Sequence, residues 1–195
     1  MKNIILINLF ILFFLNISPS FAGKFPNIPK GIDIDTFCDS KGGAYGHVIV
    51  VIDLTTELDN ARIEFIKGQV FSKEFYLNYD PFTKFSYFLI DHNEPTKQKF
   101  RFSKCLPKTG DGNFSRMHEA TFFENTKVLE SISNKFFNKG NDLHKEIFSE
   151  TKESKYSYIY ETIAYIFQNP KSDFKSNHSK RDLVIVSDLM QNTER

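Results

Sequence analysis

The sequence contains no tryptophan, only two cysteines and almost no excess of charge of either sign. Its 195 residues include 25 Lys or Arg and 24 Asp or Glu, which gives a formal net charge of +1. This balance argues against binding of nucleic acid or an anionic membrane by bulk electrostatics. The 41% of apolar residues, with 22 Phe and 8 Tyr, predict one packed domain of ordinary size with a core filled largely by phenylalanine.

The sequence also lacks an apolar run long enough to span a bilayer comfortably. Its most apolar stretch, residues 4–17, follows Met1-Lys2 and stops before Pro19. Ser20 and Ala22 are small residues at the two positions that a signal peptidase reads, so residues 1–22 are expected to be a signal peptide. The alternative is an uncleaved N-terminal anchor. A cleaved signal predicts an exported protein, periplasmic or secreted, with no stable membrane span after cleavage.

Two cysteines are too few for a zinc site, and the five histidines show no metal spacing. The histidines are therefore expected at the surface or in turns. In an exported protein Cys38 and Cys105 predict a disulfide, which would close a loop of roughly 67 residues and stabilise the fold by about 3–4 kcal/mol. The alternative is two separate buried thiols. Lys104 and Lys108, beside Cys105, are expected to be solvated loop charges.

The first part of the domain follows a lead-in rich in proline and glycine. Residues 23–46 predict an extended N-terminal lead-in, and the domain proper is expected over 47–195. The continuous β-branched run at 47–53 predicts a strand buried on both faces. Thr56 and Asp59 fit a capping box for a helix over about 57–72.

A hairpin is expected after this helix. Residues 85–91 predict a second strand, and a turn leads into a shorter alternating segment over 97–103. The alternation places Phe100 and Phe102 on one face of an exposed, antiparallel edge strand.

Two helices and a last strand complete the expected order. Helical spacing predicts a helix over about 119–138, which Gly140 stops. A second helix is expected to begin at Ser157, whose side chain would cap it, and to end before Pro170. Residues 182–188 are again apolar and predict the last strand.

This alternation of strands and helices predicts an α/β fold. We expect a Rossmann-like three-layer sandwich, with a mostly parallel central sheet, an antiparallel edge strand and helices on both faces. Parallel strands end at one edge of the sheet, where binding sites form. Asp53 and Asp188 each end an apolar strand, so their carboxylates would converge there if the two strands are neighbours.

Several oxygen-bearing side chains are expected near these carboxylates. Thr55 and Glu57 follow the first strand, and Ser157 opens a helix that would face the same edge. Carboxylates and hydroxyls form a hard oxygen set suited to Mg²⁺ or another divalent cation. The alternative is that these residues only cap the following helices, with Glu57 complementing a helix dipole.

Three segments resemble the loops of a von Willebrand factor type A (vWA) domain: Asp53-Leu-Thr-Thr-Glu57, the serine that opens Ser157-Tyr-Ile-Tyr-Glu-Thr-Ile, and the acid in Val-Ile-Val-Ser-Asp188-Leu. In that family the loops read Asp-x-Ser-x-Ser, Thr and Asp, and together form a metal-ion-dependent adhesion site. The resemblance implies that Asp53 is the first acid, Thr55 the first hydroxyl, Ser157 the equivalent of the Thr and Asp188 the final acid.

The chain departs from this family pattern in two places. Glu57 stands where the second hydroxyl is expected, so it either binds the metal directly or marks a lost site. The resemblance covers residues 47–195, and the sequence ends soon after Asp188, where the family continues with further strand-helix units. The vWA-like domain is therefore expected to be either a short variant or C-terminally incomplete.

The expected function is an exported vWA-like protein-binding module whose divalent cation contacts a carboxylate of a partner protein. No nucleophile-base pairing and no Gly-x-Ser-x-Gly elbow is visible in the sequence, which disfavours an enzyme. One alternative is a metal-free structural subunit of an envelope assembly. A less favoured one is a metal-dependent hydrolase that uses Asp53, Glu57 and Asp188.

Overall fold

The computed structural model describes residues 33, 35–39, 43–56, 58–91, 95–109, 126–149, 154, 156–174 and 180–187. The predicted signal peptide, Glu57, Asp188 and the first residues of the predicted helix 119–138 lie outside this set. No helix within these ranges has both the length and the apolar character needed to cross a bilayer.

In the described part of the chain, four strands form one open sheet of order β3-β2-β1-β4. The strands are β1 (Gly46–Asp53), β2 (Thr83–Ile90), β3 (Arg101–Cys105) and β4 (Lys180–Val186). β1 pairs in parallel with both β2 and β4, and β3 pairs antiparallel with β2 at the edge. The predicted α/β fold, with a mostly parallel sheet and an antiparallel edge strand, is confirmed at this level.

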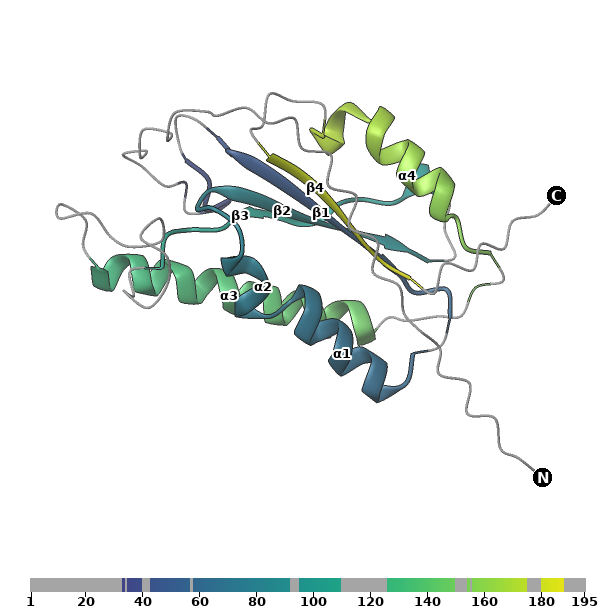
Figure 1. Cartoon of the computed structure of the whole chain (residues 1–195), viewed down its shortest axis with the longest axis horizontal. Coiled ribbons are helices and arrows are strands. Elements are labelled where there is room, and N and C mark those ends of the chain that lie inside the picture. Colours follow the sequence, from purple (N-terminus) through teal and green to yellow (C-terminus); the bar gives the residue numbers. More distant parts are fainter. Residues whose placement is uncertain are drawn as a thin grey trace.

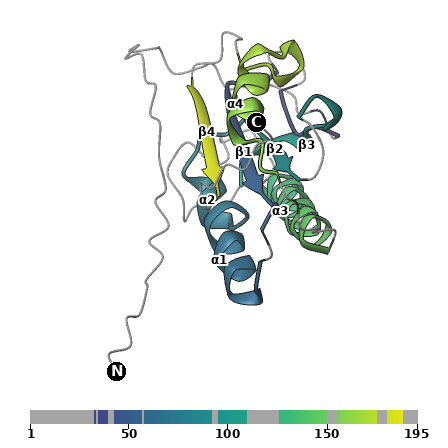
Figure 2. The ribbon, with the colours of Figure 1, turned by 90° about the vertical axis from the view of Figure 1, so that its right-hand side faces the viewer.

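Helices lie on both sides of the sheet (Figure 1). On one side are α1 (Asn60–Val70), α2 (Lys73–Leu77) and α3 (Thr126–Ser149), and on the other is α4 (Ile159–Gln168). Short 3₁₀ turns, η1 (Pro95–Lys97) and η3 (Pro170–Ser172), follow β2 and α4. The view in Figure 2 agrees, with α4 on the opposite side of the strands from α1 and α3.

The central strand β1 contributes side chains to two apolar clusters, because its side chains alternate between the two faces of the sheet. Val48, Val50 and Ile52 pack with residues of α1, α2 and α3. Ile49 and Val51 pack with residues of α4 and with Phe174. All eight residues of β1 are buried, as its β-branched run predicts.

Residues before β1 belong to the same core. Phe37 is buried, and its ring lies 6.1 Å from that of Phe136 on α3. Cys38 and Cys105 form the disulfide that the sequence predicts. The backbone N–H of Cys105 also donates to the carbonyl of Thr36 at 2.8 Å. The disulfide therefore fastens the segment before β1 to the end of β3.

The first helix differs from the prediction at both ends. Its N-cap is Asp59, whose side chain accepts a hydrogen bond from the backbone N–H of Arg62 at 2.8 Å, and not Thr56. The helix ends at Val70, and Ser72 then caps the separate helix α2 by accepting from the N–H of Phe75. A second cap thus divides what the apolar spacing predicted as one helix.

Gly140 does not stop a helix, because α3 runs through it to Ser149. A Cβ atom at position 140 would lie 2.9 Å from the hydroxyl of Tyr76. That hydroxyl lies 2.8 Å from the hydroxyl of Tyr87, which donates to the carbonyl of Val70, and burial raises the pKa of both tyrosines. The glycine therefore leaves room beside α3 for the buried ring and hydroxyl of Tyr76.

Phe100 and Phe102 lie on opposite faces of the sheet, which contradicts the predicted alternation. The Phe100 ring packs 5.1 Å from that of Phe88 on the α4 side, whereas the Phe102 ring packs 5.3 Å from that of Phe136 on the other side. Phe102 has φ 71° and Ser103 has φ 41°, and the pairing of β2 with β3 shifts register at this point. A local irregularity of this kind re-aims side chains that strict alternation would place together.

Three polar residues expected at the surface are buried instead. His47 is 1%, His144 8% and Lys108 2% exposed. The remaining histidines lie outside the described residues. Lys108 lies two residues after Leu106, which is fully buried beside the disulfide. This segment is therefore buried, whereas its polar composition predicted a solvated loop.

Candidate functional site

Asp53 lies at the carboxyl end of the central strand of the sheet. It is the last residue of β1, and its neighbours β2 and β4 both run parallel to β1. The three strands therefore end at one edge, where loops from different parts of the chain can meet. The neighbouring position of β1 and β4, on which the predicted convergence depends, is confirmed.

The carboxylate of Asp53 accepts four hydrogen bonds from three segments of the chain. Its Oδ1 accepts from the backbone N–H of Thr55 at 3.0 Å and from the Thr55 hydroxyl at 2.6 Å. Its Oδ2 accepts from the hydroxyls of Ser157 and Ser187, each at 2.9 Å. All four residues are buried, with exposed fractions between 1% and 8%. The loop after β1, the residue that precedes α4 by two and the residue after β4 thus meet on one acid.

Ser157 does not cap α4, contrary to the prediction. The N-cap position is Tyr158, and it makes no side-chain capping hydrogen bond. Asp53 does not cap α1 either, since Asp59 does so. A buried carboxylate without hydrogen-bond donors costs far more free energy than a helix end that water can solvate. The Ser157 hydroxyl therefore donates to Asp53 and does not cap the helix. Capping therefore does not explain these two residues.

Ser187 is a member of the cluster that the sequence interpretation missed. Val186 pairs with Ile52, so the next residue along each strand, Ser187 and Asp53, lie level with each other. The sequence does show a serine directly before the predicted ligand Asp188. Its position beside Asp53 follows only from the register between β1 and β4, which the sequence does not show. The structure brings together Asp53, Thr55 and Ser157 of the predicted set, whereas Glu57 and Asp188 lie outside the described residues and stay predictions.

The oxygen atoms of this cluster are of the type that binds small, hard cations. A hydroxyl that donates to Asp53 keeps its oxygen lone pairs, and carboxylate and hydroxyl oxygens are ligands that Mg²⁺ accepts. Within the described ranges, no group of three His, Cys, Asp or Glu side chains could hold a metal ion. Asp53 is the one acid among the four residues of this cluster, so a divalent cation held here would need further negative charge.

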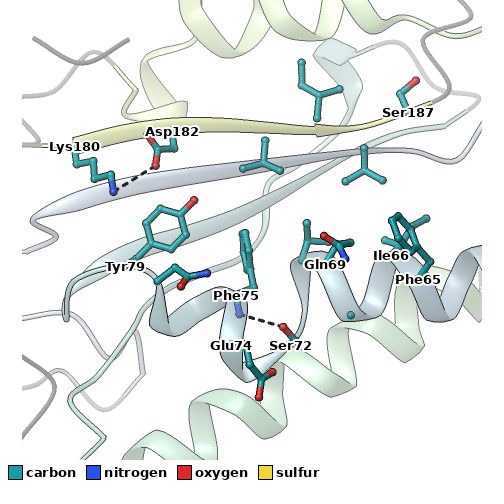
Figure 3. Close-up of a pocket in the computed structure, with 16 residues that line it drawn as sticks. Phe65, Ile66, Gln69, Ser72, Glu74, Phe75, Tyr79, Lys180, Asp182 and Ser187 are labelled. Carbon is teal, nitrogen blue, oxygen red and sulfur yellow. Dashed lines mark hydrogen bonds and ion pairs between the residues drawn. The ribbon is translucent and has the colours of Figure 1, made fainter. Parts of the chain in front are cut away.

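A groove of about 420 Å³ adjoins this cluster (Figure 3). One wall is β4, from Lys180 to Ser187, and the other is formed by α1 and α2. Ser187 lines the groove and also donates to Asp53, so the groove begins at the candidate site. At its far end the Nζ of Lys180 lies 3.9 Å from the Oδ2 of Asp182.

A histidine-serine contact lies at the other end of the sheet. The Nε2 of His47, near the start of β1, is 3.0 Å from the hydroxyl of Ser86, which is 3.1 Å from the hydroxyl of Ser103. His47 and Ser86 are almost fully buried, so their contact satisfies polar groups inside the fold. This row is separate from Asp53, which ends the same strand.

The family resemblance rests on Asp53, Thr55, Ser157 and Asp188 and on their order along the chain. Three of these four residues gather in the described structure, and the acid Asp53 is the group on which the other two converge. No protein-family model matches the chain, and neither a curated protein nor a solved structure matches it.

Proposed function

We propose that this protein is an exported vWA-like binding module that holds Mg²⁺ or another divalent cation at the edge where β1 and β4 end. The cation completes its coordination with a carboxylate of a partner protein. The observation that carries the proposal is the convergence of Thr55, Ser157 and Ser187 on the buried carboxylate of Asp53. These three hydroxyls come from the same three loops that resemble the family's metal site.

Each residue has a distinct role in this proposal. Asp53 supplies negative charge, and Thr55 and Ser157 supply neutral oxygens. Asp188 and Glu57 add the further charge that a divalent cation requires. Ser187 orients the Asp53 carboxylate through its hydrogen bond. The bound cation supplies the attraction for an acidic group on the partner.

The proposal extends to the fold and the compartment. A Rossmann-like three-layer sandwich is supported by the mixed sheet with helices on both sides (Figure 1). Export to the periplasm or the medium is supported by the disulfide between Cys38 and Cys105, because disulfides persist in oxidising compartments. The near-zero net charge supports a protein partner over nucleic acid.

One observation favours the metal-free structural subunit as the second candidate. Asp53 already accepts four hydrogen bonds from the protein, so its carboxylate is satisfied without a cation. In that case the cluster ties three loops together, and the surfaces of the fold make the contacts with the assembly.

Calorimetric titration with Mg²⁺ and with Mn²⁺ tests the proposal. We expect saturable binding to the parent protein and none to Asp53→Ala or to Asp53→Asn, which preserves the side-chain shape. Asp91→Ala is the matched control, since Asp91 directly follows β2 at the same edge and should leave cation binding unchanged. Absence of binding to a parent protein that is folded by circular dichroism would replace this proposal with the metal-free subunit.

A further inference from the structure

The carboxylate of Asp53 has all its acceptor positions occupied by donors from the protein. An ionised carboxylate accepts about four hydrogen bonds, two at each oxygen atom. Its Oδ1 accepts two from Thr55, at 3.0 and 2.6 Å, and its Oδ2 accepts one each from Ser157 and Ser187, at 2.9 Å. A cation that binds either oxygen atom therefore has to replace one of these donors, because the donor hydrogen and the cation repel each other at the same lone pair.

Thr55 is the donor least able to give way. It lies two residues after Asp53, and both its backbone N–H and its hydroxyl donate to the same Oδ1 atom. This is a local turn fixed by the backbone, and the hydroxyl bond is the shortest of the four. Replacing these bonds would change the conformation of the loop that follows β1. A cation is therefore expected to bind at Oδ2.

The two serines at Oδ2 differ in their surroundings. Ser157 is 1% exposed, so its hydroxyl has little contact with water if it turns away from Asp53. Ser187 is 8% exposed and lines the groove between β4 and the helices (Figure 3). Its hydroxyl can rotate about one side-chain bond and donate to water in that groove. Of the four donors, the Ser187 hydroxyl therefore leaves the carboxylate at the lowest cost.

We infer that the hydroxyl of Ser187 competes with the cation for Oδ2 of Asp53 and so limits the affinity of the proposed site. In the cation-free protein, its hydrogen bond orients the carboxylate. When Mg²⁺ binds, the cation takes the place of this hydroxyl, and Ser157 remains as a neutral oxygen ligand. This inference rests on the proposed function, and it names the residue that restricts how tightly the cation is held.

Calorimetric titration of two matched serine variants with Mg²⁺ tests the inference, because the expected effects have opposite signs. Ser187→Ala should bind Mg²⁺ about tenfold more tightly than the parent, since only the parent loses a hydrogen bond to a charged group on binding. Ser157→Ala removes a donor to the same oxygen atom at the same distance but should bind more weakly, because Ser157 is a ligand. General damage to the site would weaken both variants.

Two further variants control for the chemical group and for the location. Ser187→Thr restores the hydroxyl and should return the affinity towards that of the parent. Ser187→Ala combined with Asp53→Ala should not bind, which places the gained affinity at Asp53. Circular dichroism establishes that each variant is folded. Binding by Ser187→Thr as tight as by Ser187→Ala, or binding by the double variant, would overturn the inference.

Urea denaturation supplies an independent measurement. Without a cation, Ser187→Ala should have a lower midpoint than the parent, because it lacks one hydrogen bond to a buried acid. At one Mg²⁺ concentration the midpoint of the variant should then rise by more than that of the parent, because a more tightly bound ligand stabilises the folded state more. An equal or smaller rise would contradict competition between Ser187 and the cation.

The titrations separate this inference from the proposed function. If the parent binds Mg²⁺ and Ser187→Ala binds it equally or more weakly, the inference is overturned and the proposed function stands. If neither the parent nor any serine variant binds Mg²⁺ or Mn²⁺, both are overturned. If Ser187→Ala binds and the parent does not, the inference holds, whereas the proposed function gives way to the metal-free subunit.

Discussion

The hydroxyl of Ser157 donates a 2.9 Å hydrogen bond to Oδ2 of Asp53 across 104 positions of sequence. Ser157 is 1% and Asp53 8% exposed, so the bond lies inside the fold. The helix that follows Ser157 begins without a side-chain cap. A residue type that commonly caps helices is used here to satisfy a buried acid at the end of the central strand.

Ser157→Ala should destabilise the protein by about 1.5–3 kcal/mol, because it removes a buried hydrogen bond to an acid. Under the proposed function it should also weaken Mg²⁺ binding. Urea denaturation and calorimetric titration measure the two effects. Ser149→Ala is the control, since the Ser149 hydroxyl donates to the carbonyl of Glu146 at the surface and should matter little. Equal midpoints for the two variants would contradict a structural role for the Ser157–Asp53 bond.

The fold was predictable where apolar patterning is uninterrupted. The run of apolar residues in β1 predicts a strand buried on both faces, and the structure buries all eight of its residues. The patterning failed where a local backbone feature intervenes. The positive φ values at Phe102 and Ser103 reverse the faces of the edge strand, and nothing in the local sequence, which has no glycine there, signals them. The prediction that Gly140 ends a helix was wrong, because glycine is typical both of helix ends and of close packing contacts inside a helix.

The candidate site was predictable only in part, for a similar reason. Asp53 and Thr55 are neighbours in sequence, and the end of a buried strand marks both of them. Ser157 was expected at this edge because it opens a helix that would face it, although the same position also predicted a helix cap. Ser187 depends on the register by which Val186 pairs with Ile52. Register follows from packing between strands that are far apart in the chain, so a single strand's sequence does not reveal it.

Gly140→Ala should destabilise the protein by about 1–3 kcal/mol, although alanine favours helix formation. The new Cβ atom would lie 2.9 Å from the hydroxyl of Tyr76, which is buried and held by its hydrogen bond to Tyr87. Gly68→Ala is the matched control in α1, because a Cβ there meets nothing within 4 Å. It should stabilise the protein by about 0.5–1 kcal/mol. Thermal unfolding of both variants measures the difference, and a stabilised Gly140→Ala would show that Tyr76 can move.

Stability should fall as the pH drops below about 6.5, and His144 should contribute to this fall. Burial lowers the pKa of His144 from its ordinary value, and so do the nearby charges of Lys67 and Lys145, while Glu64 opposes them. The imidazole packs against Phe71 and Phe148, with ring centroids 5.3 and 4.9 Å away. Because the unfolded chain takes up the proton more readily, this contribution to stability is present above the unfolded pKa and is lost as the pH falls.

His144→Phe removes this titration while it keeps a ring between Phe71 and Phe148. Its urea midpoint should decline less than that of the parent between pH 7.5 and pH 5.5. The comparison of slopes cancels the contribution of other titrating groups, which the two proteins share. Parallel declines of the two proteins would show that His144 does not contribute.

The disulfide between Cys38 and Cys105 should contribute about 3–4 kcal/mol to stability, because it closes a long loop in the unfolded chain. The double variant Cys38→Ser, Cys105→Ser should lose this amount in urea denaturation, and dithiothreitol should lower the parent to the same midpoint. The reductant should leave the double variant unchanged, which controls for its other effects. Since Phe37 packs against Phe136 beside the disulfide, its backbone amide should also exchange faster in the double variant. If the parent's midpoint were indifferent to the reductant, the core around Phe37 would hold this segment without the covalent link.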